Sequence, residues 1–188
     1  MPLSKDQYAT LSGRKLEVAR RHLIELERDL PSGQVTDPAG PEDSRAELES
    51  HADGCVLQAY AAFDTFACAI AVRFELANPD RASFTGLVGR LSEPSSSFVA
   101  IEVTAVCVAV RAVLSLKEWQ DLSFYRNLAA HRGVVGQRTR FSLDEGFSFR
   151  IGDLDGPDPD GSEALPILKR LVEWAERTLP PLLKLVGD

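Results

Sequence analysis

Apolar residues recur at helical spacing through most of the chain. The first helical segment follows Ser4 and Gln7, which have the spacing of a capping box, and its apolar positions are Leu16, Val18, Leu23, Ile24 and Leu30. Residues 31–43 hold three prolines and two glycines, which predicts a surface loop. The pattern therefore predicts a first helix that stops at Pro31.

A second, longer helical segment follows this loop. Ser44 and Glu47 repeat the capping-box spacing, and the helix is predicted to run to Ala77, before an Asn-Pro pair. It would be about 50 Å long. Its second half, AYAAFDTFACAIAV, is apolar on all sides, as is typical of a central helix packed against several neighbours. Asp64 is the exception in this stretch, and two interpretations stay open: it pairs with an arginine, or it faces a partly wet groove.

Three further helices are predicted in the middle of the chain. Residues 80–91 fit a short helix. Residues 98–117 are rich in β-branched side chains, but a length of about 20 residues favours a buried helix, because strands usually span about 4–8 residues. Residues 121–132 continue as another helix or a kinked extension, and Gly133 suits the position just after its end.

The last third of the chain changes character. Residues 139–151 alternate apolar and polar positions around a turn that ends in glycine, which predicts a β-hairpin. A final helix is predicted to start at Ser162 or Leu165 and to be broken by Pro180-Pro181. We therefore expect a mainly all-α protein, an up-and-down bundle of four to six helices in a single domain over residues 1–188, with the hairpin inserted before the last helix.

The composition narrows the functional classes. A length of 188 residues fits one domain, and a formal charge of −7 discourages nonspecific binding to nucleic acid or acidic membranes. The cysteines are odd in number and each lies in an apolar run, which indicates reduced core residues: Cys55, Cys68 and Cys107. The first residues lack the apolar segment of a signal peptide, and the apolar runs 56–72 and 98–110 are interrupted and too short for a membrane span. The expectation is a cytoplasmic protein without a membrane segment.

The stretch YRNLAAHRG, residues 125–133, is the candidate for a chemical site, and a polar helix end that faces water is the alternative. It brings Arg126, Asn127 and His131 together near the predicted end of a helix. The chain has none of the patterns of a phosphate-binding loop, a paired-cysteine metal site, a zinc-protease helix or a nucleophile elbow, so we expect neither a metal nor a cofactor. The aspartates of residues 152–161 fail the spacing of an EF-hand and favour an acidic surface turn.

An arginine, a polar residue directly after it and a histidine one turn later, in an all-helical domain, resemble the R-x4-6-H motif of the HEPN superfamily. Arg126, Asn127 and His131 match these three positions. The resemblance implies a metal-independent endoribonuclease that acts as a homodimer through the motif helix, as in toxin–antitoxin systems and phage defence. It also covers members that have lost activity and serve as binding modules.

The chemistry of these three side chains suits RNA cleavage. His131 can exchange a proton near neutral pH, and Arg126 can bind a phosphate through two N–H groups. Asn127 and His131 are four residues apart and share a helix face, whereas Arg126 lies about 140° round the helix from His131. One copy therefore builds a sparse site. The resemblance implies that two copies complete it by meeting along this helix.

Basic residues surround the motif. Residues 123–150 hold five arginines against Asp144 and Glu145, a net charge of +3, while the rest of the chain carries −10. Such a stretch fits an RNA backbone, and we expect RNA contacts from Arg132, Arg138, Arg140 and Tyr125. The arginines could equally cover the wet face of the hairpin, and packing is the stronger interpretation for Tyr125.

One departure from the family pattern limits the resemblance. Members that are adenylylated carry a tyrosine two residues after the motif histidine, where this chain has Gly133. That form of regulation is not expected here. The alternative function is a catalytically inactive HEPN-like module that binds a protein or a nucleotide. An antitoxin or a regulatory subunit as partner is a further hypothesis that the residues leave open.

Overall fold

A computed structural model describes the backbone of residues 3–30, 42–92, 100–132, 137–142, 146–151 and 162–187. Within these ranges, the side chains of residues 42–45, 100, 131–132, 137–142, 146–149 and 162 lie outside the description. The elements in chain order are α1 (Lys5–Asp29), α2 (Glu42–Arg73), the 3-10 helix η1 (Pro79–Arg81), α3 (Leu87–Leu91), α4 (Ala100–Leu114), α5 (Lys117–Arg132), β1 (Gln137–Ser142), β2 (Gly146–Ile151), β3 (Ser162–Glu163) and α6 (Ala164–Gly187).

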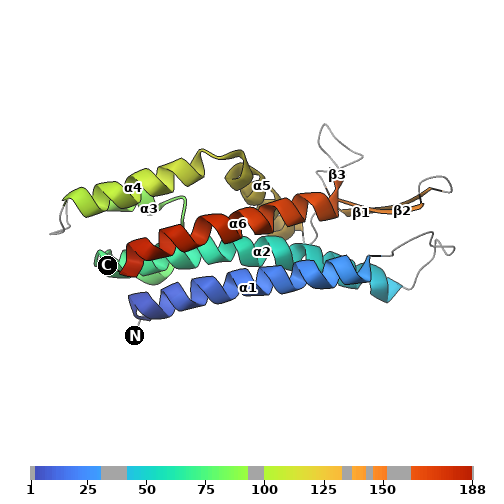
Figure 1. The fold of residues 1–188 in the computed structure, drawn as a ribbon, viewed down its shortest axis with the longest axis horizontal. Coiled ribbons are helices and arrows are strands. Elements are labelled where there is room, and N and C mark those ends of the chain that lie inside the picture. The colour runs from blue at the N-terminus through green and yellow to red at the C-terminus, as the bar shows by residue number, and fades with distance from the viewer. Residues whose placement is uncertain are drawn as a thin grey trace.

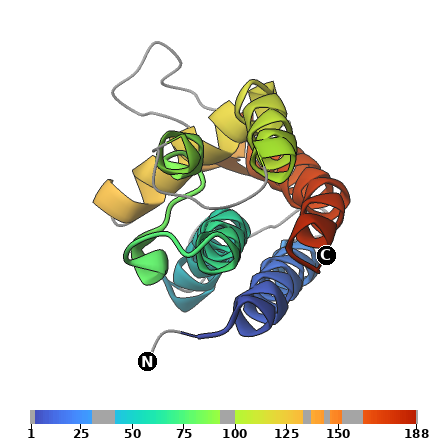
Figure 2. The same cartoon turned by 90° about the vertical axis from the view of Figure 1, so that its left-hand side faces the viewer.

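Three long helices form the body of the molecule. α1, α2 and α6 lie side by side along its longest dimension, and α2 packs against both of the others (Figure 1). α5 crosses these helices and packs on α2, and α4 lies over the bundle on the same side as α5 (Figure 2). The prediction of a mainly all-α bundle is confirmed.

The second half of α2 forms the centre of the core. Nearly every residue from Ala59 to Ala71 is buried, as the all-round apolar sequence predicts. By length and composition, residues 46–73 could also cross a membrane, but 67% of the apolar window is buried inside the bundle. A buried core helix passes the same test.

The ends of the first two helices follow from their local chemistry. At α1 the capping box is confirmed. The Ser4 hydroxyl accepts a hydrogen bond from the backbone amide of Gln7, and the Gln7 side-chain oxygen accepts one from the backbone amide of Ser4. The second capping box was predicted wrongly: α2 begins at Glu42, so Ser44 lies inside its first turn. α2 also ends at Arg73 and not at Ala77, because Glu75 takes a left-handed conformation with φ 50° and turns the chain.

The segment after α2 does not form the single short helix predicted over residues 80–91. Only η1 and α3 are helical, and the residues between them run as a turn across α2. Phe84, in this turn, is fully buried against Phe63 of α2, with ring centroids 5.1 Å apart. Burial of this aromatic ring, together with a hydrogen bond from the Phe84 backbone amide to α2, outweighs helical propensity here.

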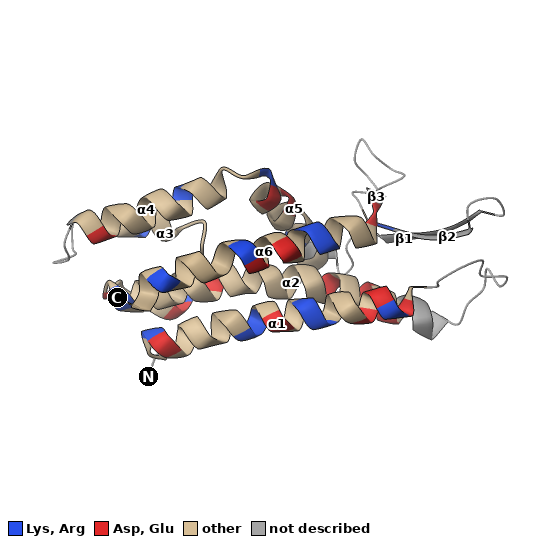
Figure 3. Ribbon diagram, in the orientation of Figure 1, with Lys and Arg blue, Asp and Glu red and all other residues tan. Residues whose placement is uncertain are grey.

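α4 differs from the predicted buried helix. One side packs on the bundle through Val106, Val110 and Val113, but the opposite side is open, and Ile101 is 78% exposed. Few charges lie on this helix (Figure 3). The prediction that this helix is buried is therefore wrong for one side, where apolar side chains face solvent.

α6 continues through Pro180 and Pro181, where a break was predicted. A proline inside a helix removes one hydrogen bond and crowds the carbonyl four residues earlier. Both prolines are exposed, while Leu179, Leu182 and Val186 around them are buried. Core packing on the other side of the helix thus holds the last two turns in place.

The predicted hairpin is present. β1 and β2 pair antiparallel with Phe141 opposite Phe147, and β3 adds to β2 at the start of α6. Ile151 is fully buried and joins the core. The acidic residues predicted to form a surface turn, 152–161, lie outside the described residues.

Candidate active site

α5 carries the motif, and its packing decides which motif residues face outward. Leu122 and Leu128 are buried against the bundle, while Phe124 and Asn127 are exposed. His131 lies one further turn along the same helix, four residues after Asn127, and its side chain lies outside the description. Arg126 is half-buried at the side of the helix that faces α2.

Two contacts hold the Arg126 guanidinium. Its Nη1 donates a hydrogen bond to Oδ1 of Asn127 at 3.1 Å. Its Cζ lies 5.0 Å from the centre of the Tyr60 ring on α2, within the range of a cation–π interaction. The structure thus joins the first two motif residues directly and links them to α2.

The Tyr60 ring rests on the aromatic core. It stacks on Trp119 of α5, with centroids 5.1 Å apart and planes inclined by 24°. Trp119 in turn packs against Phe63 and Phe84, with ring centroids 5.3 Å and 4.8 Å apart. Burial, with the Asp64 charge, raises the pKa of the Tyr60 hydroxyl, so the phenol stays neutral at physiological pH. Arg126 therefore lies over a ring that the core fixes.

Asp64 lies one turn after Tyr60 on α2. Its Oδ1 accepts a hydrogen bond from the Phe84 amide at 2.8 Å, which ties the turn after η1 to α2. Burial raises the pKa of this carboxyl, and the Phe84 amide and the Arg126 charge act in the opposite direction. Among the described residues the hydrogen-bond donor of Asp64 is therefore a backbone amide and not the arginine that the sequence suggested, and Arg126 acts on the half-buried carboxylate only through its charge.

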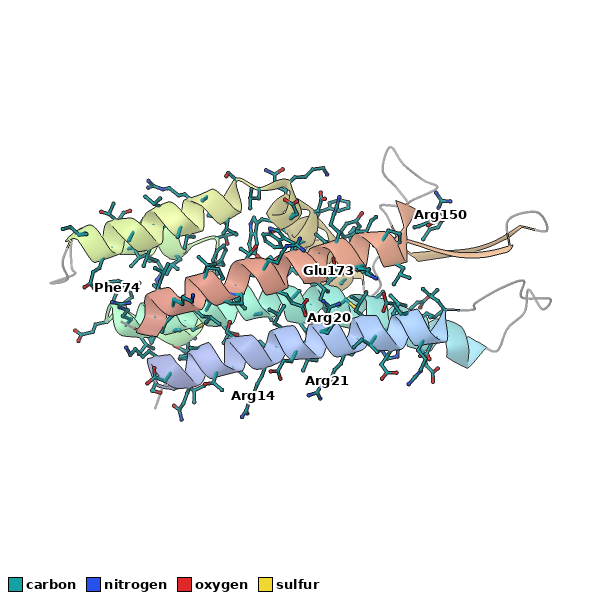
Figure 4. All side chains as sticks on the ribbon, viewed as in Figure 1. Arg14, Arg20, Arg21, Phe74, Arg150 and Glu173 are labelled. Carbon is teal, nitrogen blue, oxygen red and sulfur yellow. The ribbon has the colours of Figure 1, made fainter. Side chains whose placement is uncertain are left out.

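The residues predicted to bind RNA divide into two groups. Tyr125 is half-buried against the core and meets the Phe124 ring edge-on, with centroids 5.2 Å apart. The side chains of Arg132, Arg138 and Arg140 lie outside the description. The backbone register sets Arg138 opposite Arg150 of β2, which lies at the hairpin end of the molecule in Figure 4.

The two histidines without an assigned role form a pair. His22 of α1 and His51 of α2 face each other with their Nδ1 atoms 3.2 Å apart, and His51 Nε2 lies 3.5 Å from Asp29. Among the described residues, no three His, Cys, Asp or Glu side chains gather as a metal site would need. The three cysteines are buried and unpaired, as predicted, and burial raises the pKa of Cys55 to about 12.

Tyr60 is the site residue that the motif analysis missed. A signal existed, because Tyr60 and Asp64 are four residues apart and must share a face of a helical stretch, residues 59–72, whose other residues except Thr65 are apolar. That face had to meet a polar partner, and Arg126 was a candidate. The sequence contained no spacing that identified which arginine would lie there.

The chain was compared with protein-family models, curated proteins and solved structures, and none of the three comparisons matches it.

Proposed function

We propose that the chain is a metal-independent endoribonuclease of HEPN type that acts as a homodimer. Arg126 binds the scissile phosphate, His131 transfers a proton, and Asn127 orients Arg126. The observation that carries this proposal is the hydrogen bond between half-buried Arg126 and exposed Asn127, one turn before His131. A guanidinium held in this way is oriented before substrate arrives, which lowers the cost of binding a phosphate.

The reaction needs two proton transfers and one site of positive charge. A base removes the proton from the ribose 2′-OH, the oxygen attacks the adjacent phosphorus, and an acid protonates the departing 5′-oxygen. An imidazole suits either proton transfer because it titrates near neutral pH. Arg126 stabilises the charge that develops on the phosphorane. Two copies that meet along α5 supply the second histidine and the second arginine.

The experiment is cleavage of single-stranded RNA in excess EDTA. Arg126→Ala should lower the rate by about 100-fold or more, as removal of a transition-state donor usually does. Arg21→Ala is the matched control, because Arg21 is an exposed arginine of α1 that points away from the bundle (Figure 4). Equal rates for the wild type and Arg126→Ala would show that this arginine has no part in cleavage.

The alternative, an inactive helical module that binds a protein or a nucleotide, is favoured by one specific observation. The Arg126 charge already has partners inside its own chain: the Tyr60 ring, the Asn127 amide and the Asp64 charge. An arginine that only stabilises the α2–α5 contact would show the same contacts. In that case Arg126→Ala would lower the unfolding temperature and the purified protein would cleave no RNA.

A further inference from the structure

Within the part of the chain that the structure describes, the contacts of Arg126 use few of its hydrogen-bond donors. A guanidinium has five N–H donors in one plane, and a cation–π contact uses the face of that plane and none of the donors. Among the side chains that the structure describes, only Asn127 accepts a hydrogen bond from Arg126. A phosphate needs two parallel donors from the edge of the plane. The contacts with Tyr60 and Asn127 therefore hold the group, and among the described residues they leave N–H donors at its edge for a phosphate.

The ring that contacts Arg126 is itself packed against the core. Tyr60 is half-buried, and its ring stacks on Trp119, which is 4% exposed. Trp119, Tyr60 and Arg126 thus form a stack of consecutive contacts. Asn127 adds a lateral contact at 3.1 Å. A flexible arginine side chain that loses its rotamer freedom in this way before substrate arrives avoids the entropy cost at binding.

We propose that Tyr60 is the positioning residue for Arg126: its ring, and not its hydroxyl, sets the plane of the guanidinium that receives the RNA phosphate. This inference rests on the proposed function. It assigns a part to α2, on which the motif itself places nothing. Tyr60 acts through Arg126 and need not touch the RNA.

The test is a double-mutant cycle on RNA binding, which separates a positioning role from a structural one. The probe is a short single-stranded RNA with 2′-O-methyl groups, which binds but lacks the attacking hydroxyl. Tyr60→Leu should weaken its binding about 3–30-fold, the range of a cation–π contact. Tyr60→Leu combined with Arg126→Ala should bind no more weakly than Arg126→Ala alone. Tyr60→Phe, which keeps the ring, should bind within about 2-fold of the wild type.

Cleavage kinetics supply a second measurement. With cleavable RNA, Tyr60→Leu should lower kcat more than it raises KM, because a misplaced donor loses contacts that strengthen in the transition state. Tyr8→Leu is the matched control, since it removes a buried tyrosine ring from α1 at a place away from the motif. It should leave both constants unchanged at a temperature where all variants are folded.

A third measurement needs no RNA. The Arg126 side-chain proton signals in NMR should be shifted upfield by the Tyr60 ring in the wild type and in Tyr60→Phe, and should lose that shift in Tyr60→Leu. Unshifted signals in the wild type would overturn the stack itself.

The outcomes separate this inference from the function on which it rests. If Arg126→Ala weakens binding and cleavage but the effect of Tyr60→Leu is absent or simply additive, the positioning role is wrong and the ribonuclease proposal stands. If Arg126→Ala changes neither binding nor cleavage, both are overturned.

Discussion

Gly54 shows how one missing side chain shapes the packing of α1 against α2. A Cβ at this position would lie 2.5 Å from the His22 ring, whereas a Cβ on Gly13 of α1 would meet nothing within 4 Å. Both glycines lie inside helices, where alanine is usually preferred by about 1 kcal/mol. The two positions therefore differ in the room available for a side chain and not in the backbone preference for alanine.

Gly54→Ala should accordingly lower the free energy of unfolding by about 1 kcal/mol, because displacement of the His22 ring outweighs the helix preference. Gly13→Ala should raise it by about 0.5–1 kcal/mol. Urea denaturation of the two variants measures both changes. A stabilised Gly54→Ala variant would mean that the ring moves aside at no cost.

The His22–His51 pair makes stability depend on pH. Burial, and then the His51 charge, lower the pKa of His22 below its ordinary value of 6.5. The charged form of His22 is therefore disfavoured in the folded protein. The contribution of His22 to the free energy of unfolding is complete above pH 6.5, and it is lost as the pH falls through the lower pKa of the folded state. The pKa of His22 falls because its ring is partly removed from water and lies beside a second imidazole, and both effects disfavour the charged form.

Thermal unfolding between pH 7.5 and about 5 should show this loss in the wild type, and a shallower decline should be seen in His22→Gln. The difference between the two curves isolates His22 from the carboxylates that titrate in the same range. Parallel curves would exclude the pair as a source of the pH dependence.

At the scale of elements, the sequence predicted the features that local periodicity and turn residues determine. It missed the features that depend on how one element packs against another. Helical periodicity identified the long helices, and the turn glycine identified the hairpin, because both signals are local. The buried face of α1 runs through Ser12, Leu16 and Leu23, and Ile24, an expected core position, is 51% exposed. Which of two adjacent apolar residues faces α2 is decided by packing.

The same limit explains the middle of the chain. The apolar content of α4 gave no indication that one side of this helix, with Ile101 and Val108, is exposed. The left-handed turn at Glu75 involves a residue type that rarely adopts this conformation, so the end of α2 was placed too late. For the candidate site, the motif spacing predicted Arg126 and Asn127, whereas the contact of Arg126 with Tyr60 depends on the packing of α5 against α2, which no local spacing encodes.

Pro180 provides the test at this scale. Pro180→Ala restores an N–H that can donate to the Glu176 carbonyl, and it should raise the free energy of unfolding by about 1–3 kcal/mol. Pro166→Ala is the control, since Pro166 lies in the first turn of α6, where amides have no helical acceptor. Chemical denaturation compares the two. An unchanged Pro180→Ala would show that the helix has already adapted fully to the proline.

At the scale of the whole molecule, the proposed function depends on a second copy. The outward face of α5 carries Phe124, which is 45% exposed, and Asn127 one turn later. An exposed aromatic ring beside the motif suits the centre of a dimer contact, where such side chains contribute most of the binding energy.

Phe124→Ser should therefore weaken dimerisation at least about 10-fold and lower RNA cleavage in proportion to the lost dimer. Ile24→Ser is the matched control, because Ile24 is exposed to a similar extent on α1. Analytical ultracentrifugation over a range of concentrations measures both. A Phe124→Ser variant that dimerises like the wild type would place the contact elsewhere.

The proposed function requires that His131 takes part in RNA cleavage without a metal. The most direct measurement compares the initial rates of RNA cleavage by purified wild type and His131→Ala in excess EDTA, with His51→Ala as the histidine control. The proposed function predicts cleavage by the wild type and by His51→Ala, and a rate lower by about 100-fold or more for His131→Ala. Equal rates for the wild type and His131→Ala, or no cleavage by the wild-type dimer, would contradict it.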